Sequence, residues 1–448
     1  MVTDNLIIAD SIHKESFSIY LPTYYSEDKE WPVIFVFDAE GRGKIVTQLF
    51  KQTAEEQGYI IASSNNIRQD QDLLENVQVC ERLIGTVKNY FSVDDNSIYT
   101  AGLNEGAEAA MALSSISNNI KGVLAIGDYW INTKFLKQGS GYALVGMINS
   151  KDPDYYRLTD ITNYISKIGY PTRIYKFNED QDYPSADLIY SGIGEFTLQR
   201  MKLDTVSTVV IDVNKLFQHD IQIAENMRRQ LKLYQAYEFL ELMDNKYEED
   251  DNRQDTIKDL QKQIKRNKIF KEQRRKYNAA ATQENYKKTQ YSYYLGEDLA
   301  QVNFENLGYW NQQVKDLEES KNSGNIAEQE MGYRLQGYLQ NMAEQSFAQF
   351  QEVNANIDLL IYTAVLETIF DKENPKGYFD VISLSANDGD YATAMLYLED
   401  LLKTGYKNME ALYNIQGTLD LKLSPEYNQL IKKYIGESKF YNLKLNEK

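Results

Sequence analysis

The amino-acid sequence predicts an α/β protein in which a doubly wound, mostly parallel sheet is followed by an all-α region. Up to about residue 200, short apolar runs alternate with amphipathic stretches, as expected when helices connect parallel strands. Beyond that point the short apolar runs stop and helical periodicity continues. We therefore expect three segments: an α/β domain over 1–200, a charged helical connector over 201–283 and a helical domain over 284–448.

The strand signal occurs in seven short segments of the first part. Residues 16–22 alternate between apolar and polar, whereas 33–37 are continuously apolar and suit a strand buried on both faces. Amphipathic helices are expected over 72–91 and 105–114. The expected strands are 16–22, 33–37, 59–62, 97–102, 123–127, 143–148 and 172–177.

The overall charge limits the partners of the chain. Its 448 residues include 48 Lys and Arg against 66 Asp and Glu, which gives a formal net charge of −18. Such an acidic surface disfavours nucleic-acid phosphates and anionic lipids. Hydrophobic residues make up 42% of the chain, yet no run reaches the ~18 apolar residues of a membrane span. We expect no nucleic-acid binding and no transmembrane segment, and membrane association only peripherally, through a partner.

Residue types that carry metal or redox chemistry are scarce. Cys80 is the single cysteine, so no intrachain disulfide can form. His13 and His219 are the two histidines, which excludes a His-rich metal site and leaves two candidates for any His-dependent mechanism. We expect neither a metal nor a cofactor.

The most informative segment is 98–110, Ile-Tyr-Thr-Ala-Gly-Leu-Asn-Glu-Gly-Ala-Glu-Ala-Ala. It has the strand, tight turn and small-residue helix of a nucleophile elbow, with Gly102 and Gly106 on either side of the central residue. Taken alone, the turn has an ordinary strand-to-helix connection as its alternative. With the strand order around it, the chain resembles the esterase and depolymerase-like branch of the α/β-hydrolase superfamily over about residues 10–200.

The resemblance identifies three positions of a catalytic triad, and two of them depart from the family. Asn104 stands where the family has its nucleophilic serine, and Gln181 stands where its histidine is expected. An amide neither forms an alkoxide nor shuttles protons near neutral pH. Asp152 matches the acid position, although a solvated turn aspartate is an equal alternative. His13 lies before the expected sheet and His219 beyond its expected end, so neither replaces the missing histidine and we expect a catalytically inactive domain.

Four further residues are candidates to line the former cleft. The resemblance places Asp38 and Ala39 in the turn that supplies oxyanion-hole N–H groups in the family, and Glu105 next to the elbow residue. Ser64 follows the next expected strand, and a polar loop cap is the alternative role for its segment.

Two features mark the C-terminal half. Residues 255–276 hold nine Lys or Arg and three Asp or Glu, which indicates either a solvated helix surface or a docking face for an acidic partner. Residues 386–398 have the small/aromatic spacing of paired antiparallel helices and resemble tetratricopeptide-type repeats, whose stacked helices present concave surfaces to other proteins.

These observations favour a non-catalytic pseudo-hydrolase that acts as an interaction or scaffold protein. The resemblance implies a subunit of a bacterial cell-envelope assembly, periplasmic or outer-membrane-associated if a signal peptide was removed and cytoplasmic otherwise. One alternative is an active esterase whose nucleophile is displaced to Ser63, Ser64 or Ser150 near Asp152. Another is a module that binds a sugar or acyl ligand without converting it.

Overall fold

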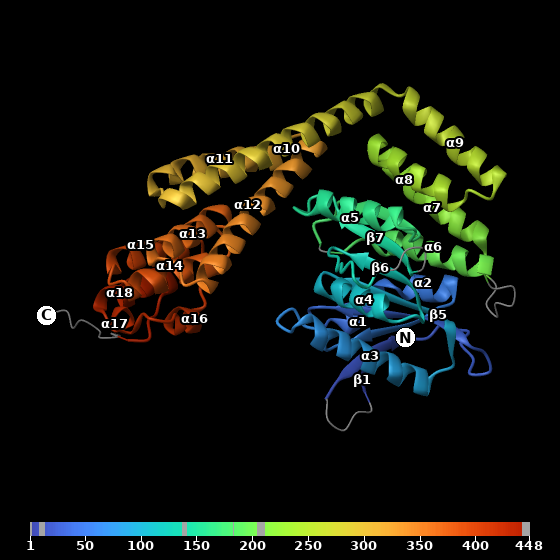
Figure 1. The fold of residues 1–448 in the computed structure, drawn as a ribbon, viewed down its shortest axis with the longest axis horizontal. Coiled ribbons are helices and arrows are strands. Elements are labelled where there is room, and N and C mark those ends of the chain that lie inside the picture. The colour runs from blue at the N-terminus through green and yellow to red at the C-terminus, as the bar shows by residue number, and fades with distance from the viewer. Residues whose placement is uncertain (1, 9–13, 137–140, 182, 204–210, 441–448) are drawn as a thin grey trace. The chain divides into compact units, whose positions relative to one another are not determined.

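A computed structural model describes residues 2–8, 14–136, 141–181, 183–203 and 211–440 (Figure 1). The chain forms two compact units, which we call the first unit (Met1–Arg275) and the second unit (Lys276–Lys448). The boundary between them falls inside one long helix, α10 (Lys268–Gln301), and inside the segment expected as a connector.

The first unit contains an eight-stranded sheet with the strand order β1-β2-β4-β3-β5-β6-β7-β8. β2 pairs antiparallel with both β1 and β4, and the other pairings are parallel. This confirms the predicted doubly wound, mostly parallel sheet. The strands are β1 (Thr3–Ile7), β2 (Ser16–Tyr20), β3 (Trp31–Asp38), β4 (Ile60–Ser64), β5 (Val93–Leu103), β6 (Ile120–Ile126), β7 (Ala143–Asn149) and β8 (Thr172–Phe177).

Helices cover both faces of the sheet, which explains the continuous apolar strands. In β3, Val33, Phe35 and Phe37 pack with α3, α4 and α5, whereas Ile34 and Val36 pack with α1, α2 and α6 on the other face. The helices are α1 (Gly43–Leu49), α2 (Lys51–Gln57), α3 (Leu73–Tyr90), α4 (Glu105–Ile116), α5 (Tyr155–Lys167) and α6 (Ala186–Leu203).

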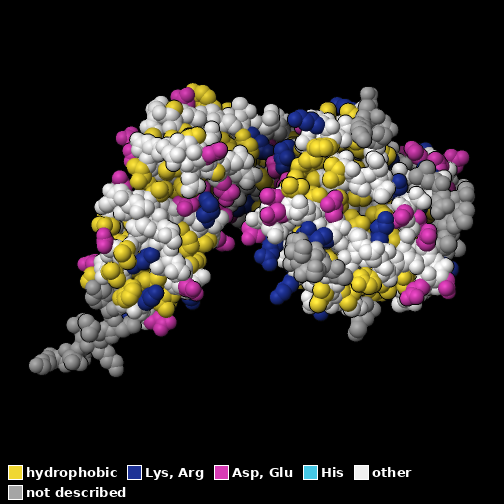
Figure 2. Space-filling view, turned by 60° about the horizontal axis from the view of Figure 1, so that its bottom comes forward, with side chains coloured by type: hydrophobic (Ala, Val, Ile, Leu, Met, Phe, Trp, Pro, Cys, Tyr) yellow, Lys and Arg dark blue, Asp and Glu magenta, His cyan; other side chains and the backbone are white. Residues whose placement is uncertain are grey.

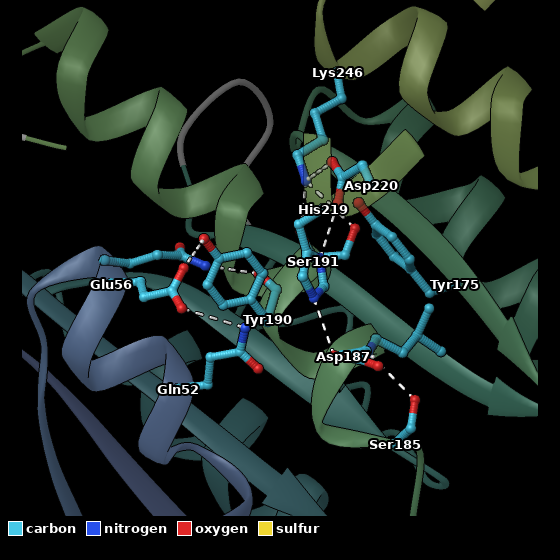
Figure 3. A network of polar contacts seen from close by, with 12 residues as sticks. Gln52, Glu56, Tyr175, Ser185, Asp187, Tyr190, Ser191, His219, Asp220 and Lys246 are labelled. Carbon is cyan, nitrogen blue, oxygen red and sulfur yellow. Dashed lines mark hydrogen bonds and ion pairs between the residues drawn. The ribbon is translucent and has the colours of Figure 1, made fainter. Parts of the chain in front are cut away.

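Three further helices, α7 (Val213–Arg229), α8 (Leu233–Lys246) and α9 (Asp251–Arg266), extend the layer of α6. A buried ion pair joins α7 and α8 to α6, with Lys246 Nζ 2.7 Å from Asp220 Oδ2 and 2.7 Å from the carbonyl oxygen of Ser191 in α6 (Figure 3). These helices therefore belong to the packed body of the first unit.

The described part of the second unit is helical, as the sequence predicts. Each of the helices α11 to α14 contacts the next one along the chain, and two apolar clusters form, one containing Trp310 and the other Leu398. Tetratricopeptide character stays a prediction. Within the described ranges, no helix is long and apolar enough to cross a membrane. After α10 come a 3-10 turn (Phe304–Asn306), α11 (Leu307–Lys321), α12 (Ile326–Glu352), α13 (Ile357–Phe370), α14 (Pro375–Asn387), α15 (Tyr391–Lys403), α16 (Met409–Asn414), α17 (Leu419–Lys422) and α18 (Pro425–Ile435).

Candidate functional site

Asn104 stands at the apex of a strained turn between β5 and α4. Its backbone has φ 50° and ψ −123°, a conformation that costs a non-glycine residue about 1–3 kcal/mol. Three backbone hydrogen bonds hold it. Its N–H donates to the carbonyl oxygen of Ile126 at 2.8 Å, and its own carbonyl accepts from Ala107 N at 2.8 Å and from Glu108 N at 3.3 Å. The turn is thus a nucleophile elbow in its backbone, with an amide side chain at the apex.

Two glycines make this turn sterically feasible. A Cβ on Gly102 would lie 2.2 Å from the carbonyl oxygen of Gly106, and a Cβ on Gly106 would lie 2.3 Å from that of Phe37 in β3. Any side chain at either position would push α4 away from the sheet. Gly102 and Gly106, which indicated an elbow in the sequence, therefore allow the close contact between α4 and the sheet that this turn requires.

A cavity of about 360 Å³ opens beside the elbow, at the edge where the parallel strands end. The structure brings five of the expected site residues, Asp38, Ala39, Asn104, Glu105 and Asp152, together along its wall. Besides a glycine, the wall also contains four residues that were not predicted from the sequence: Glu40, Gln69, Asp128 and Asp154.

Two of the expected site residues do not line this cavity. Ser64 is fully buried because β4 continues two residues beyond the expected strand end and pairs with β2 through Phe17 and Ser64. Gln181 is exposed in the loop after β8. That loop is tied to the loop after β7, since Lys151 pairs with Asp180 at 2.5 Å.

Neither histidine is placed at the cavity by the structure. His13 lies outside the described residues. His219 lies on α7, where its Nε2 is 3.1 Å from Asp187 Oδ1. Burial, the largest single influence, lowers the pKa of His219, but the neighbouring carboxylates of Asp220 and Asp187 outweigh it and the pKa is raised.

The cavity is strongly acidic, and two arginines neutralise part of this charge. Arg42 pairs with Asp38 at 2.8 Å and Glu40 at 2.9 Å, and Arg157 pairs with Asp154 at 2.6 Å and Asp128 at 3.3 Å. The carboxylates in the wall are Asp38, Glu40, Glu105, Asp128, Asp152 and Asp154.

Burial and mutual repulsion shift two acids of this region toward neutral pH. Burial, with the charges of Asp154 and Asp128, raises the pKa of Asp152 to about 6. Burial, with the charges of Asp128 and Glu105, raises the pKa of Glu108, one turn further along α4, to about 7. Both groups can exchange protons near neutral pH.

The side chains of the cavity wall limit the chemistry it can perform. Its described residues are Asp, Glu, Asn, Gln, Ala and Gly, so they offer proton exchange and hydrogen bonding, and no hydroxyl, thiol, imidazole or amine for nucleophilic catalysis. Within the described ranges, no three His, Cys, Asp or Glu side chains are placed to hold a metal ion.

The serines considered as displaced nucleophiles lie inside the protein. Ser63 and Ser64 are fully buried in β4, and Ser63 Oγ accepts a hydrogen bond from Thr47 at 2.7 Å. Ser150, at the end of β7, is 7% exposed and does not line the cavity.

The sequence held a signal for some of the missed wall residues. Asp128 lies two residues after β6 and Asp154 two residues after Asp152, so both follow parallel strands at the edge where such sites form. Gln69 comes from a longer loop after β4 and has no comparable signal.

No family model matches the chain, and no curated protein matches it by sequence. Solved esterase structures resemble it at low identity. Est1E from Butyrivibrio proteoclasticus is 14% identical with a TM-score of 0.37, over 45% of this chain and 100% of that one. Esterase 2 of Thermogutta terrifontis is 10% identical with a TM-score of 0.37, over 46% and 97%. S-formylglutathione hydrolase (FrmB) from Staphylococcus aureus is 11% identical with a TM-score of 0.36, over 44% and 97%.

The first unit has an α/β-hydrolase fold. The mostly parallel sheet with its order β1-β2-β4-β3-β5-β6-β7-β8 and the strained turn after β5 carry this assignment. A fold of this kind hosts many functions, so the function of this chain has to be argued from its own residues.

Proposed function

We propose that the chain is a non-catalytic interaction protein, in which a pseudo-hydrolase unit is joined to a helical unit that binds other proteins. The observation that carries the proposal is Asn104 at the apex of the elbow. Acyl transfer needs an attacking oxygen or sulfur at that point, and the nitrogen of an amide is not nucleophilic. The carboxylates of the described wall do not stand at that apex, and no described wall residue is a serine, cysteine or histidine that could replace the missing pair.

The surface of the helical unit supports the second half of the proposal. Tyr286 and Tyr293, seven residues apart on α10, are 61% and 63% exposed, and Leu396 on α15 is 54% exposed. Tyrosine combines a large apolar ring with a hydrogen-bonding hydroxyl and is enriched at protein interfaces.

A basic surface of the first unit suits an acidic partner. Lys258, Lys262 and Lys265 share one exposed face of α9, and Lys268 and Lys271 share one on α10. The opposite faces dock through Ile257, Ile264 and Phe270. Figure 2 shows Asp and Glu side chains spread over the face of each unit drawn there, in keeping with a net charge of −18. A concentrated basic surface in such a chain attracts acidic protein segments.

The proposal includes a cell-envelope assembly as the setting. It rests on the resemblance alone and is tested by fractionating the native cells and locating the protein by immunoblot. Recovery in the periplasmic or outer-membrane fraction supports this setting, and recovery in the cytoplasmic fraction overturns it.

Affinity purification of the tagged full-length protein from those fractions, with quantitative mass spectrometry, tests the interaction role. We expect a partner at near-equal abundance that is depleted in a K258Q/K262Q/K265Q/K268Q/K271Q variant. The matched control replaces five exposed lysines elsewhere on the first unit by Gln, which are Lys14, Lys29, Lys51, Lys134 and Lys167. A clean preparation without any partner under several extraction conditions would overturn the interaction role.

Ligand binding without turnover is a second candidate, favoured by the open cavity of about 360 Å³. Its polar wall suits the hydroxyl groups of a sugar better than an acyl chain. A thermal-shift screen with mono- and disaccharides tests it, because a ligand at 100 times its Kd stabilises the folded state by about 2.7 kcal/mol. A rise in the thermal midpoint that is lost in Asn104→Leu would support ligand binding. An unchanged midpoint with every sugar would overturn it.

A further inference from the structure

A second cavity, of about 630 Å³, lies at the opposite edge of the same sheet. It is bounded by the start of β5 and β6 and by the ends of α4 and α6, so it shares no residue with the acidic cavity beside Asn104. All of its wall residues belong to the first unit.

One wall residue is a buried arginine with unused hydrogen-bonding capacity. Arg200, in the last turn of α6, is 5% exposed. Its Nη2 donates to the carbonyl oxygen of Gln57 at a long 3.5 Å, and its guanidinium lies 5.0 Å from the ring centre of Tyr59. Its Nε has no hydrogen-bond partner, and among the described residues no carboxylate forms an ion pair with it. The carbonyl end of α6 favours the charge without giving that N–H an acceptor.

The rest of the wall is partly aromatic and partly hydroxylic. The rings of Tyr142 and Tyr170 meet edge to face at 5.5 Å, and Gly141 makes room for them, since a Cβ there would lie 1.9 Å from the Tyr170 ring. Ser114 and Ser115 donate their hydroxyl protons to carbonyl oxygens within α4, at 2.7 and 2.8 Å. With their protons used in this way, Ser114 Oγ accepts from Thr100 at 3.1 Å and Ser115 Oγ accepts from Tyr142 at 3.3 Å.

The charges at this cavity select for a singly charged anion. Arg200 and Lys121 supply two cations, and Asp94 supplies one carboxylate. Leaving a buried guanidinium N–H unsatisfied is costly, and a carboxylate matches the guanidinium with two parallel hydrogen bonds. These three groups carry a net charge of +1, which a monoanion neutralises, whereas a dianion such as a phosphate monoester loses more hydration on entering the cavity and leaves an excess negative charge there.

We propose that this cavity binds a small aromatic carboxylate, with its ring against Tyr142 and Tyr170 and its carboxylate on Arg200. Lys121 lies at the exposed rim and strengthens the attraction. This site is independent of the interaction role proposed above, because it concerns a different edge of the sheet.

Isothermal titration of the full-length protein with benzoate tests the proposal. A ligand of this size is expected to bind with a Kd of about 1 mM. Benzyl alcohol, which lacks the charge, and phenyl phosphate, which carries two charges, are each expected to bind at least tenfold more weakly than benzoate.

Variants separate a binding role of Arg200 from a structural one. Arg200→Met should weaken benzoate binding tenfold or more while the thermal midpoint stays the same or rises, since methionine fills the space without a buried charge. Arg229→Met, which removes an exposed arginine of α7, and Asn104→Ser, at the other cavity, should both bind benzoate like the wild type.

Three results would overturn the proposal. They are the lack of saturable binding up to 10-fold the expected Kd, equal binding of benzoate by wild type and Arg200→Met, and equal affinity for benzoate and benzyl alcohol. Preference for phenyl phosphate over benzoate would overturn the assignment to a carboxylate.

Discussion

The acidic cavity beside Asn104 and the buried network of α6, α7 and α8 both gather charged side chains, yet they treat a carboxylate in opposite ways. In the network, Lys246 donates a hydrogen bond to Asp220 at 2.7 Å (Figure 3). Tyr247 donates another at 2.8 Å, and the attraction of Lys246 lowers the pKa of Asp220 despite its burial. In the cavity, burial and neighbouring acids raise the pKa of Asp152 to about 6. The network therefore holds the fold together, whereas the cavity leaves charge available for proton exchange or a ligand.

Removing the buried cation of the network should cause the largest loss of stability. Lys246→Met leaves the fully buried Asp220 without its cation, and we expect a loss of about 3–5 kcal/mol in the free energy of unfolding. Urea denaturation measures it. Lys262→Met, which removes an exposed pair with Asp259, is the matched control and should change stability by less than about 0.5 kcal/mol. Equal effects of the two substitutions would mean that the network does not hold these helices.

Adding a side chain at a glycine of the elbow is expected to lower the free energy of unfolding by nearly as much. Gly106→Ala places a Cβ 2.3 Å from the Phe37 carbonyl oxygen, which should destabilise the first unit by about 2–3 kcal/mol. Gly85→Ala, in the middle of α3, is the matched control. A Cβ at that position would have no other atom within 4 Å, so the substitution should stabilise by about 0.5–1 kcal/mol. Equal urea midpoints for the two variants would contradict the close packing of α4 on β3.

Relieving the backbone strain at Asn104 should raise the stability of the protein. Asn104→Gly removes the side chain that penalises φ 50°, so we expect a gain of about 1 kcal/mol. Asn104→Ala keeps the penalty and should show no gain. Stabilisation by both substitutions, measured by thermal unfolding, would show that the asparagine side chain rather than the backbone is the source of the strain.

The smallest expected effect is a pH-dependent change in stability caused by Glu108, which lies near the acidic cavity. Glu108 has a folded pKa of about 7, above its unfolded value, so the folded state binds the proton more tightly. The stabilisation that protonated Glu108 gives the folded state is present at low pH and is lost as the pH rises toward 7. We expect Glu108→Gln to be about 1 kcal/mol more stable than wild type at pH 8, after allowing for solvent screening, and no more stable at pH 4. The exposed Glu81→Gln should show no such difference in thermal midpoints.

Local sequence patterns predicted the features that depend on neighbouring residues. The elbow was recognisable because Gly102, Asn104 and Gly106 act within one turn of the chain, and the continuous apolar run of β3 indicated burial on both faces. β1 was missed because its Thr-Asp-Asn-Leu-Ile sequence is mostly polar and lies partly exposed at the sheet edge.

Features that join distant segments were not predictable in the same way. The acidic wall combines loops that follow five different strands, and no local pattern shows that Asp128 and Asp154 share one arginine, Arg157. Ser64 was placed in a polar loop because serine is common there, whereas pairing of β4 with β2 extends the strand through it. The network around Asp220 likewise depends on residues that come from three helices.

Intact-mass measurement after treatment with a fluorophosphonate tests the central claim, a hydrolase fold without a working nucleophile, most directly. We predict an unchanged mass for the native full-length protein, together with no turnover of short acyl esters above a heat-denatured sample. A single adduct that forms on the native protein and is lost on substitution of Ser63, Ser64 or Ser150 would contradict this claim and establish the displaced-nucleophile esterase instead.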